Sequence, residues 1–396
     1  MKNAETVIIG GGVSGTSIAY HLAERGMNGI VILEREKMLG LGSTGKATGG
    51  VRAQFETDIN IKLSLYSLDF FRNWEFDCEY EPRGYIFLAT EQRHIDYLKR
   101  TGERQRELGY KEVEIVDVRT ISKLVPGLNC EDILGGSFGP ADGFINPLSV
   151  LEGFSTGAAL LGTRVISGTT VRSIEVEGGR VTGVHTSNGL LECDNVVLCA
   201  GAWSQHIAAT AGIELPVEPQ RRQIVWARAP QPLPNDLPMV IDLADGFHFR
   251  PARDFVFKGS DAETSVFANH DVLFAYPDPD EPASFSTDFD EGFLDKVGER
   301  ASHRAPFLNG AKIIYEKCRA GLYENTPDHH AILGGCGVEG LYFAAGFSGH
   351  GVMHSPATGK ALAEIILDGE ASFMDVSCLS LDRFTKGELL HETAFI

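Results

Sequence analysis

A strand, a glycine turn and a helix follow one another at the start of the chain, and this order constrains the fold more than any other feature. The segment is TVIIGGGVSGTSIAYHLAERG, residues 6–26. Its first residues are mostly β-branched, as in a buried strand, and its last residues place apolar side chains on one helical face. Between them, Gly10, Gly12 and Gly15 follow the GxGxxG order. The pattern predicts a Rossmann-type βα unit that binds a dinucleotide.

Each glycine of this turn has its own physical task. Gly10 permits the tight turn, Gly12 lets a pyrophosphate approach the backbone, and Gly15 lets the helix pack on the strand. The free N–H groups at the start of the helix can hold the anion. A second predicted strand, GIVILE, ends at Glu34, 22 residues beyond Gly12. An acidic side chain at that place can accept a hydrogen bond from a ribose hydroxyl.

The stretch after Glu34 decides which dinucleotide is expected. Residues 40–50 are small and have no helical period, whereas an NAD-binding Rossmann domain usually continues with another βαβ unit. Such a stretch can run beside an extended cofactor. Only at Gly10–Gly15 does a GxGxxG pattern stand between a predicted strand and a predicted helix, so nothing indicates a second nucleotide. We therefore expect FAD and not NAD.

Length and charge limit the remaining possibilities. A chain of 396 residues, 43% of them hydrophobic, exceeds the usual size of a single core, so two domains are expected. The formal net charge of −19 opposes a nucleic-acid or anionic-membrane partner. No segment approaches twenty consecutive apolar residues, and the start does not resemble a signal peptide, so we expect a cytoplasmic protein without a membrane span. Seven scattered cysteines, never in CxxC spacing, indicate neither a disulfide framework nor a zinc site.

The rest of the chain alternates helical and β patterns. Helices are expected in the segments INIKLSLYSLDFFRNW, EQRHIDYLKRTGERQRELG, NPLSVLEGFSTGAALLG and SPATGKALAEIILDG. Strands are expected in GYIFLAT, in residues 164–201 with turns at Gly178-Gly179 and Asn188-Gly189, and in a β-rich region over about 216–315. That region contains RRQIVWARA, GFHFRP and ETSVFANH. It is interrupted by AYPDPDEPAS, which we interpret as a solvated loop.

Five motifs in this order resemble the FAD-dependent D-amino-acid oxidase superfamily: VIIGGGVSG, STGKATGGVRAQF, VVLCAGAWS, GLYENTPDHHAILG and GFSGHGVMHSPATGKALAEII. The likeness is strongest to the β subunits of sarcosine oxidase and dye-linked L-proline dehydrogenase. It implies an α/β protein, in which a Rossmann-like FAD-binding domain is interleaved with a substrate domain built on a large mixed β-sheet. The FAD-binding domain is expected over residues 1–80, 141–215 and 320–396, and the substrate domain over 81–140 and 216–319.

The resemblance also implies the cofactor site. Gly321 stands where monomeric sarcosine oxidase has the cysteine that bonds to FAD, so the cofactor is expected to be non-covalent. The segment GFSGHG is expected to face the flavin, with the following helix directed at N1 and C2=O. The residues expected to bind FAD are Gly10, Gly12, Val13, Ser14, Gly15, Glu34, Arg35, Ser43, Thr44, Gly49, Gly50, Val51, Arg52, Val171, Ala200, Gly201, Trp203, Gly321, Gly346, Ser348, Gly349, His350, Gly351, Val352 and Met353.

Enzymes of this family pass a hydride equivalent from the carbon beside an amine to flavin N5, which gives an imine. A small amine or amino acid of the sarcosine, proline or glycine type is the expected substrate, and partner subunits are possible. Phe55 and Tyr323 stand where relatives have arginines that grip a substrate carboxylate. Met353 stands where monomeric sarcosine oxidase has a lysine that promotes reaction with oxygen, so a dehydrogenase with another electron acceptor, in addition to oxygen or in its place, is favoured. The catalytic candidates are Arg52, His248, Tyr323, His350 and Met353, with Arg250 also a candidate for the pocket.

Four other hypotheses stay open or are set aside. The chain can be a self-sufficient D-amino-acid or glycine oxidase that makes hydrogen peroxide, or a flavoprotein kept for assembly without catalysis. A metal site on His350 and His354 is disfavoured because no acidic or cysteine partner accompanies them, so no metal is expected. A serine hydrolase is excluded because Ser348 is not in GxSxG order.

Overall fold

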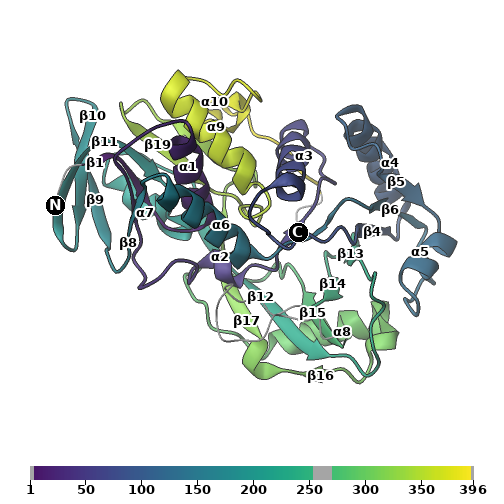
Figure 1. Ribbon diagram of the computed structural model, residues 1–396. Helices are drawn as coiled ribbons and strands as arrows, with labels where there is room; N and C mark the ends of the chain where they lie inside the picture. Colours follow the sequence, from purple (N-terminus) through teal and green to yellow (C-terminus); the bar gives the residue numbers. More distant parts are fainter. Residues whose placement is uncertain (1–3, 253–269, 394–396) are drawn as a thin grey trace.

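The computed structural model describes residues 4–252 and 270–393, and two large β-sheets dominate it (Figure 1). One has eight described strands and the other nine. A third sheet has only two strands, β3 (Gly50–Val51) and β7 (Gly143–Phe144). In Figure 1 the eight-stranded sheet and its helices lie on the left, and the nine-stranded sheet lies to the right and below. The mixed α/β architecture expected from the sequence is confirmed.

The eight-stranded sheet contains the predicted dinucleotide-binding unit. Its order is β18–β19–β11–β1–β2–β8, and β10 and β9 extend from β11. The five strands from β19 to β8 pair in parallel, as in a Rossmann fold. The bounds are β1 (Ala4–Ile9), β2 (Ile30–Leu33), β8 (Arg164–Ile166), β9 (Val171–Glu177), β10 (Arg180–Thr186), β11 (Gly189–Leu198), β18 (Ile332–Gly335) and β19 (Leu341–Ala345).

Side chains of this sheet alternate between two cores. Ile8, Ile32 and Val197 pack into a cluster with the helices α1 (Val13–Glu24), α6 (Pro147–Leu160) and α9 (Ser355–Asp368). Their neighbours along the strands, such as Val7 and Val31, pack on the opposite face into a cluster with the β9–β11 layer. Burial on both faces explains why these strands read as continuous apolar runs in the sequence.

The nine-stranded sheet forms the second part of the molecule. Its order is β16–β12–β15–β14–β13–β4–β6–β5, and β17 also pairs with β12. The range 320–396, expected for the FAD-binding domain, begins within β17, a strand of this second sheet. The bounds are β4 (Tyr85–Ala89), β5 (Glu114–Val116), β6 (Gly135–Gly139), β12 (Glu218–Arg228), β13 (Met239–Asp242), β14 (His248–Pro251), β15 (Asp271–Ala275), β16 (Lys312–Ile313) and β17 (Arg319–Asn325).

The remaining helices cover the sheets or connect them. They are α2 (Ser43–Lys46), α3 (Asp58–Asn73), α4 (Gln92–Glu107), α5 (Val118–Leu124), α7 (Ser204–Ala209), α8 (Phe293–Arg304) and α10 (Asp382–Lys386). Short 3₁₀ turns are η1 (Gly201–Trp203), η2 (Pro306–Leu308), η3 (Tyr315–Lys317) and η4 (Ser377–Leu379). Within the described ranges, no helix is long and apolar enough to cross a membrane.

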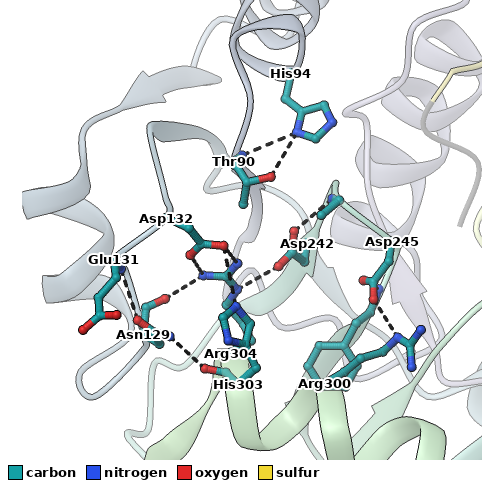
Figure 2. A network of polar contacts seen from close by, with 12 residues as sticks. Thr90, His94, Asn129, Glu131, Asp132, Asp242, Asp245, Arg300, His303 and Arg304 are labelled. Atoms are coloured by element: carbon teal, nitrogen blue, oxygen red, sulfur yellow. Dashed lines mark hydrogen bonds and ion pairs between the residues drawn. The ribbon is translucent and has the colours of Figure 1, made fainter.

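A buried arginine ties α8 to the second sheet (Figure 2). Arg304 Nε lies 2.7 Å from Asp242 Oδ2 at the end of β13, and its Nη1 and Nη2 each lie 2.8 Å from one oxygen of Asp132. Nη1 also donates to the Asn129 carbonyl oxygen. The guanidinium therefore joins a helix, a strand and a loop that are distant in sequence.

The middle of the chain departs from the sequence interpretation in two places. The region 216–315, expected to be β-rich, also contains α8, whose mixed polar sequence gives a weaker pattern than the strands beside it. The loop AYPDPDEPAS is not simply solvated, because the carboxylates of Asp278 and Glu281 are buried and paired with Lys296 and Arg221. Most of the expected strand ETSVFANH lies outside the described residues.

Candidate functional site

A cavity of about 420 Å³ extends from the glycine turn after β1 to the wall formed by β12 and β17. Its lining comes from both large sheets and from the extended segment 40–52. It is therefore placed where a ligand would contact the Rossmann-type sheet at one end and the second sheet at the other. Sites between such units are common locations for cofactors and substrates.

The glycine turn has the geometry that a dinucleotide requires. Gly10 has φ +109°, and a Cβ there would lie 2.2 Å from the Cys199 carbonyl oxygen. A Cβ on Gly15 would lie 2.1 Å from the Gly10 carbonyl oxygen. Packing within the protein thus explains both glycines. Gly12 differs, because a Cβ there would meet only Thr44 Oγ1, at 3.4 Å. The space in front of Gly12 belongs to the cavity, which fits close approach of a pyrophosphate.

Glu34 lies at the end of β2, beside this turn. Its Oε2 accepts from the Gly11 N–H at 2.8 Å, and its Oε1 accepts from the Glu36 N–H at 2.8 Å. The carboxylate is thus fixed at the cavity wall, where a ribose hydroxyl can reach it. Beside it, the Arg35 guanidinium carbon lies 4.1 Å from the centroid of the Trp203 ring. This pair forms the outer part of the nucleotide end, with Val171, Ala200 and Gly201 also on the lining.

The segment from Ser43 to Arg52 runs along the cavity between its two ends. Ser43 Oγ donates to the Leu322 carbonyl oxygen at 2.8 Å, which ties the segment to β17. Thr44 Oγ1 accepts from the Val13 N–H at 3.1 Å, which ties it to α1. The small residues are required here because, for example, a Cβ on Gly50 would lie 1.9 Å from the Tyr85 hydroxyl oxygen.

Asp142 supports the end of this segment. Its Oδ1 accepts from the Ala53 N–H at 2.7 Å and its Oδ2 accepts from Gln54 Nε2 at 2.8 Å. Burial raises the pKa of the Asp142 carboxyl to about 7, although these hydrogen bonds act in the opposite direction. Arg52 in turn donates to the Gln54 carbonyl oxygen. A buried polar network therefore fixes the direction of the Arg52 side chain.

The GFSGHG segment forms a second turn at the cavity. Gly346, Ser348 and Gly349 all have positive φ. A Cβ on Gly349 would lie 2.4 Å from Tyr323 Cε2, so only glycine allows this approach. Glu324 Oε2 accepts from the Gly346 N–H at 3.1 Å, and burial raises the pKa of the Glu324 carboxyl to about 7. The turn leads into α9, which begins after His354 and ends at Gly369.

The two histidines near this turn are buried and neutral at pH 7. Burial lowers the pKa of His354 to about 3 and that of His350 well below its ordinary value, and the positive charge of Arg52 adds to both shifts. His354 Nε2 lies 2.8 Å from Ser64 Oγ, and the His350 ring meets the Phe55 ring edge-on at 5.0 Å between centroids. Among the described residues, no three His, Cys, Asp or Glu side chains are grouped to hold a metal.

His248 and Tyr323 face the cavity from the second sheet. His248 Nδ1 lies 2.9 Å from the Gly246 carbonyl oxygen and must donate to it, so a neutral ring carries its lone pair on Nε2. Burial lowers the pKa of His248 to about 4. At neutral pH, Nε2 therefore carries no proton and can accept a hydrogen bond. Burial also raises the pKa of Tyr323, which keeps its hydroxyl protonated.

The cavity brings together most of the residues expected from the sequence. Four of the expected cofactor residues, Gly15, Val51, Gly346 and Ser348, lie behind its surface. Arg250 is also absent from the lining, because it packs on Phe144 and donates to the Thr48 carbonyl oxygen. The expected residues on the lining are Gly10, Gly12, Val13, Ser14, Glu34, Arg35, Ser43, Thr44, Gly49, Gly50, Arg52, Val171, Ala200, Gly201, Trp203, His248, Gly321, Tyr323, Gly349, His350, Gly351, Val352 and Met353.

Sequence reasoning missed several polar residues on the lining: Lys46, Tyr85, Arg222 and Glu324. Arg222 lies in the predicted strand RRQIVWARA, in which the adjacent residues Arg221 and Arg222 point to opposite faces of the sheet. The alternation of side chains along a strand predicts that one of the two arginines faces the protein interior. Which one faces the cavity depends on the pairing of β12 with β17, which lies about a hundred residues further along the chain.

A parallel sheet with a glycine turn, joined by one cavity to a second mixed sheet, defines a dinucleotide-binding protein of two interleaved parts. The family model described as "DAO: FAD dependent oxidoreductase" matches residues 5–365, and the chain belongs to this family. The family resemblance found in the sequence and the FAD cofactor are therefore confirmed.

Individual relatives agree with this assignment. The chain is 31% identical to FAD-dependent oxidoreductase domain-containing protein 1 of Xenopus laevis, over 99% of this chain and 84% of that one. It is 31% identical to the mitochondrial dimethylglycine dehydrogenase of Rattus norvegicus, over 97% of this chain but 45% of that protein. The crystal structure of L-proline dehydrogenase from P. horikoshii superposes with a TM-score of 0.87 at 27% identity, covering 98% of this chain and 100% of the other.

Proposed function

We propose that this chain uses non-covalent FAD to oxidise a small amine or amino acid of the sarcosine, proline or glycine type. The observation that carries the proposal is the cavity, which joins the dinucleotide turn to a wall bearing His248 and Tyr323. Two relatives are named for dimethylglycine and L-proline, substrates in which an amine nitrogen and a carboxylate share one carbon. Their names support this substrate class.

The residues at the cavity can bind and orient FAD. Gly12 and the start of α1 would hold the pyrophosphate, Glu34 a ribose, and Arg52 with the 349–353 turn the flavin end. Bound FAD supplies the acceptor at N5 for the hydride equivalent, which leaves an imine that water hydrolyses. Because Gly321 has no side chain, the lining at that position offers no atom for a covalent bond to the cofactor.

The protein's own side chains contribute orientation and control of protonation. Removing a hydride from the carbon beside an amine requires the amine to be neutral, since an ammonium nitrogen has no lone pair to stabilise the cation that forms. His248 Nε2 can accept a hydrogen bond from that amine, and the low pKa of the ring keeps it an acceptor. The fixed positive charge of Arg52 favours the negative charge that develops on the acceptor side.

The proposal favours a dehydrogenase over an oxidase. Met353 lines the cavity and brings no charge to it, so nothing at that position attracts the negative charge that oxygen acquires on reduction. An electron acceptor other than oxygen, and a possible partner subunit that carries it, belong to this proposal, as does a cytoplasmic location.

The test is anaerobic reduction of the yellow protein by a panel of sarcosine, dimethylglycine, L-proline, glycine and D-alanine. Acid precipitation first shows whether the flavin is released, as expected for a non-covalent cofactor. Loss of the oxidised flavin absorbance with one of these compounds, followed by slow peroxide production in air, would support a dehydrogenase. Rapid peroxide would instead show an oxidase. A flavin that no amine reduces, but whose removal unfolds the protein, would point to a role in assembly.

A further inference from the structure

Arg222 places a positive charge at the end of the cavity formed by the second sheet. It lies on β12 directly opposite Gly321 of β17, and both residues line the cavity. Arg222 Nε and Nη1 are buried and have no hydrogen-bond partner within the described part of the chain. Buried donors of a charged group normally have partners, because leaving them unsatisfied is costly. The Arg222 guanidinium therefore needs a hydrogen-bond acceptor that the described protein atoms do not supply.

Two acidic residues that act on Arg222 are already paired with other cations. Glu281 binds Arg221 through both carboxylate oxygens, at 2.9 and 3.1 Å. Asp278 lies 2.5 Å from Lys296 Nζ. Both carboxylates also attract the Arg222 guanidinium electrostatically from a distance. In a chain with a formal charge of −19, this part of the cavity is thus locally positive, and an anion fits it.

The neighbouring side chains indicate which anion. The Arg222 guanidinium carbon lies 5.5 Å from the centroid of the Tyr323 ring, and the Tyr323 hydroxyl is a further donor facing the same space. Pyrophosphate is accounted for at the opposite end, where Gly12 and α1 supply backbone N–H groups. A planar guanidinium beside a phenol suits a carboxylate, which can accept two parallel hydrogen bonds from arginine.

We propose that Arg222 binds the carboxylate of the substrate, with Tyr323 as a second donor, so that the enzyme selects amino acids over simple amines. This inference rests on the proposed function and adds a specificity-determining residue to it. The carboxylate held at Arg222 and the amine nitrogen held near His248 would together orient the carbon between them.

The first experiment measures binding without turnover. Calorimetric titration of the FAD-loaded protein with pyrrole-2-carboxylate, and with its uncharged carboxamide as the matched ligand, compares wild type with Arg222→Met and Arg222→Lys. Arg222→Met should weaken carboxylate binding about 10- to 100-fold and leave carboxamide binding unchanged. Arg222→Lys should recover part of the loss. Arg228→Met, an exposed arginine on the same strand, is the control and should bind as wild type does.

The second experiment compares L-proline with pyrrolidine and measures anaerobic flavin reduction. In wild type, L-proline should reduce the flavin faster than pyrrolidine does. In Arg222→Met, this difference in rate should be largely lost. If no amine reduces the wild-type flavin but carboxylates still bind in an Arg222-dependent way, the proposed function fails and the carboxylate site stands. If wild type binds no carboxylate, or Arg222→Met binds it unchanged, the carboxylate site is wrong whatever the enzyme oxidises. Loss of FAD affinity with unchanged carboxylate binding would assign Arg222 to the cofactor and overturn the inference.

Discussion

The guanidinium carbon of Arg52 lies 3.8 Å from the centroid of the Phe55 ring. The contact is close enough for a cation–π interaction, and it adds to the hydrogen bond that Arg52 donates to the Gln54 carbonyl oxygen. Arg52 Nη2 is buried and has no hydrogen-bond partner among the described residues. The positive charge is thus held in one place at the cavity and is available to a bound ligand.

Replacing Arg52 by Met should slow anaerobic flavin reduction by the best substrate about 10²-fold, since a positioned charge that stabilises developing negative charge is worth that much. Stopped-flow absorbance measures the rate, and the flavin midpoint potential should fall in the same variant. Arg100→Met removes an exposed arginine of α4 that pairs with Glu56, and it should leave both quantities unchanged. Equal reduction rates in wild type and Arg52→Met would remove Arg52 from the reaction.

The parts of the fold that the sequence predicts are those with strong local patterns. The βα unit around Gly10, the helix after Asn146 and the helix that ends at Gly369 agree with the structure, because caps, glycines and apolar periodicity lie within a few residues of each other. Asn146 Oδ1, for example, accepts from the N–H groups of Leu148 and Ser149.

The features that the sequence does not predict depend on long-range contacts. Asp142 reads as a loop residue, yet it holds the Ala53 backbone 89 residues away. Arg222 reads as one of two charged residues in a strand, and only the pairing with β17 turns it toward the cavity. No local period carries information about such partners, because sheet register is set by pairing across the whole chain.

Replacing Met353 by Lys should accelerate the reaction of the reduced enzyme with oxygen, by an amount on the order of 10²-fold. Met353 lines the cavity next to the 349–352 turn, so the ammonium group would enter the cavity at the turn that we propose faces the flavin. Reoxidation is followed by mixing anaerobically reduced protein with aerated buffer. Met353→Leu keeps an apolar side chain of similar volume and should behave as wild type does. Identical reoxidation rates for the Lys and Leu variants would show that this position does not control oxygen reactivity.

Stability should depend on pH through His354. Its pKa is about 3 in the folded protein against an ordinary value of 6.5, so between these values the unfolded chain binds more protons. This histidine therefore causes stability to fall as pH drops below 6.5, by at most about 1.4 kcal/mol per pH unit.

His354→Gln can keep the hydrogen bond with Ser64 Oγ but cannot take up the proton. Urea unfolding at pH 7.5, 6.0 and 5.0 should give a shallower loss of stability in this variant than in wild type. Asp142 and Glu324, whose carboxyl pKa values are raised, act in the opposite direction in both proteins and cancel in the comparison. His391→Gln, at an exposed position, controls for removing a histidine. Parallel curves for wild type and His354→Gln would contradict the assignment.

Replacing Arg304 by Met should lower the free energy of unfolding by about 3–5 kcal/mol, because Asp242 would keep a buried carboxylate without its partner. β13 carries Met239 and Ile241 on the cavity lining, so its displacement should also weaken ligand binding. Chemical denaturation measures the stability. The double variant Arg304→Met, Asp242→Asn should regain much of the loss, since the unpaired charge is removed.

Arg300 on the same helix provides the comparison. It pairs with Asp245 and packs on the Tyr276 ring, but its side chain is partly exposed, so Arg300→Met should cost only about 1 kcal/mol. The contrast follows from desolvation: water can replace the partner of Asp245, whereas protein atoms surround Asp242. Equal losses for Arg300→Met and Arg304→Met would mean that lost packing, and not the uncompensated buried charge, sets the stability of this connection.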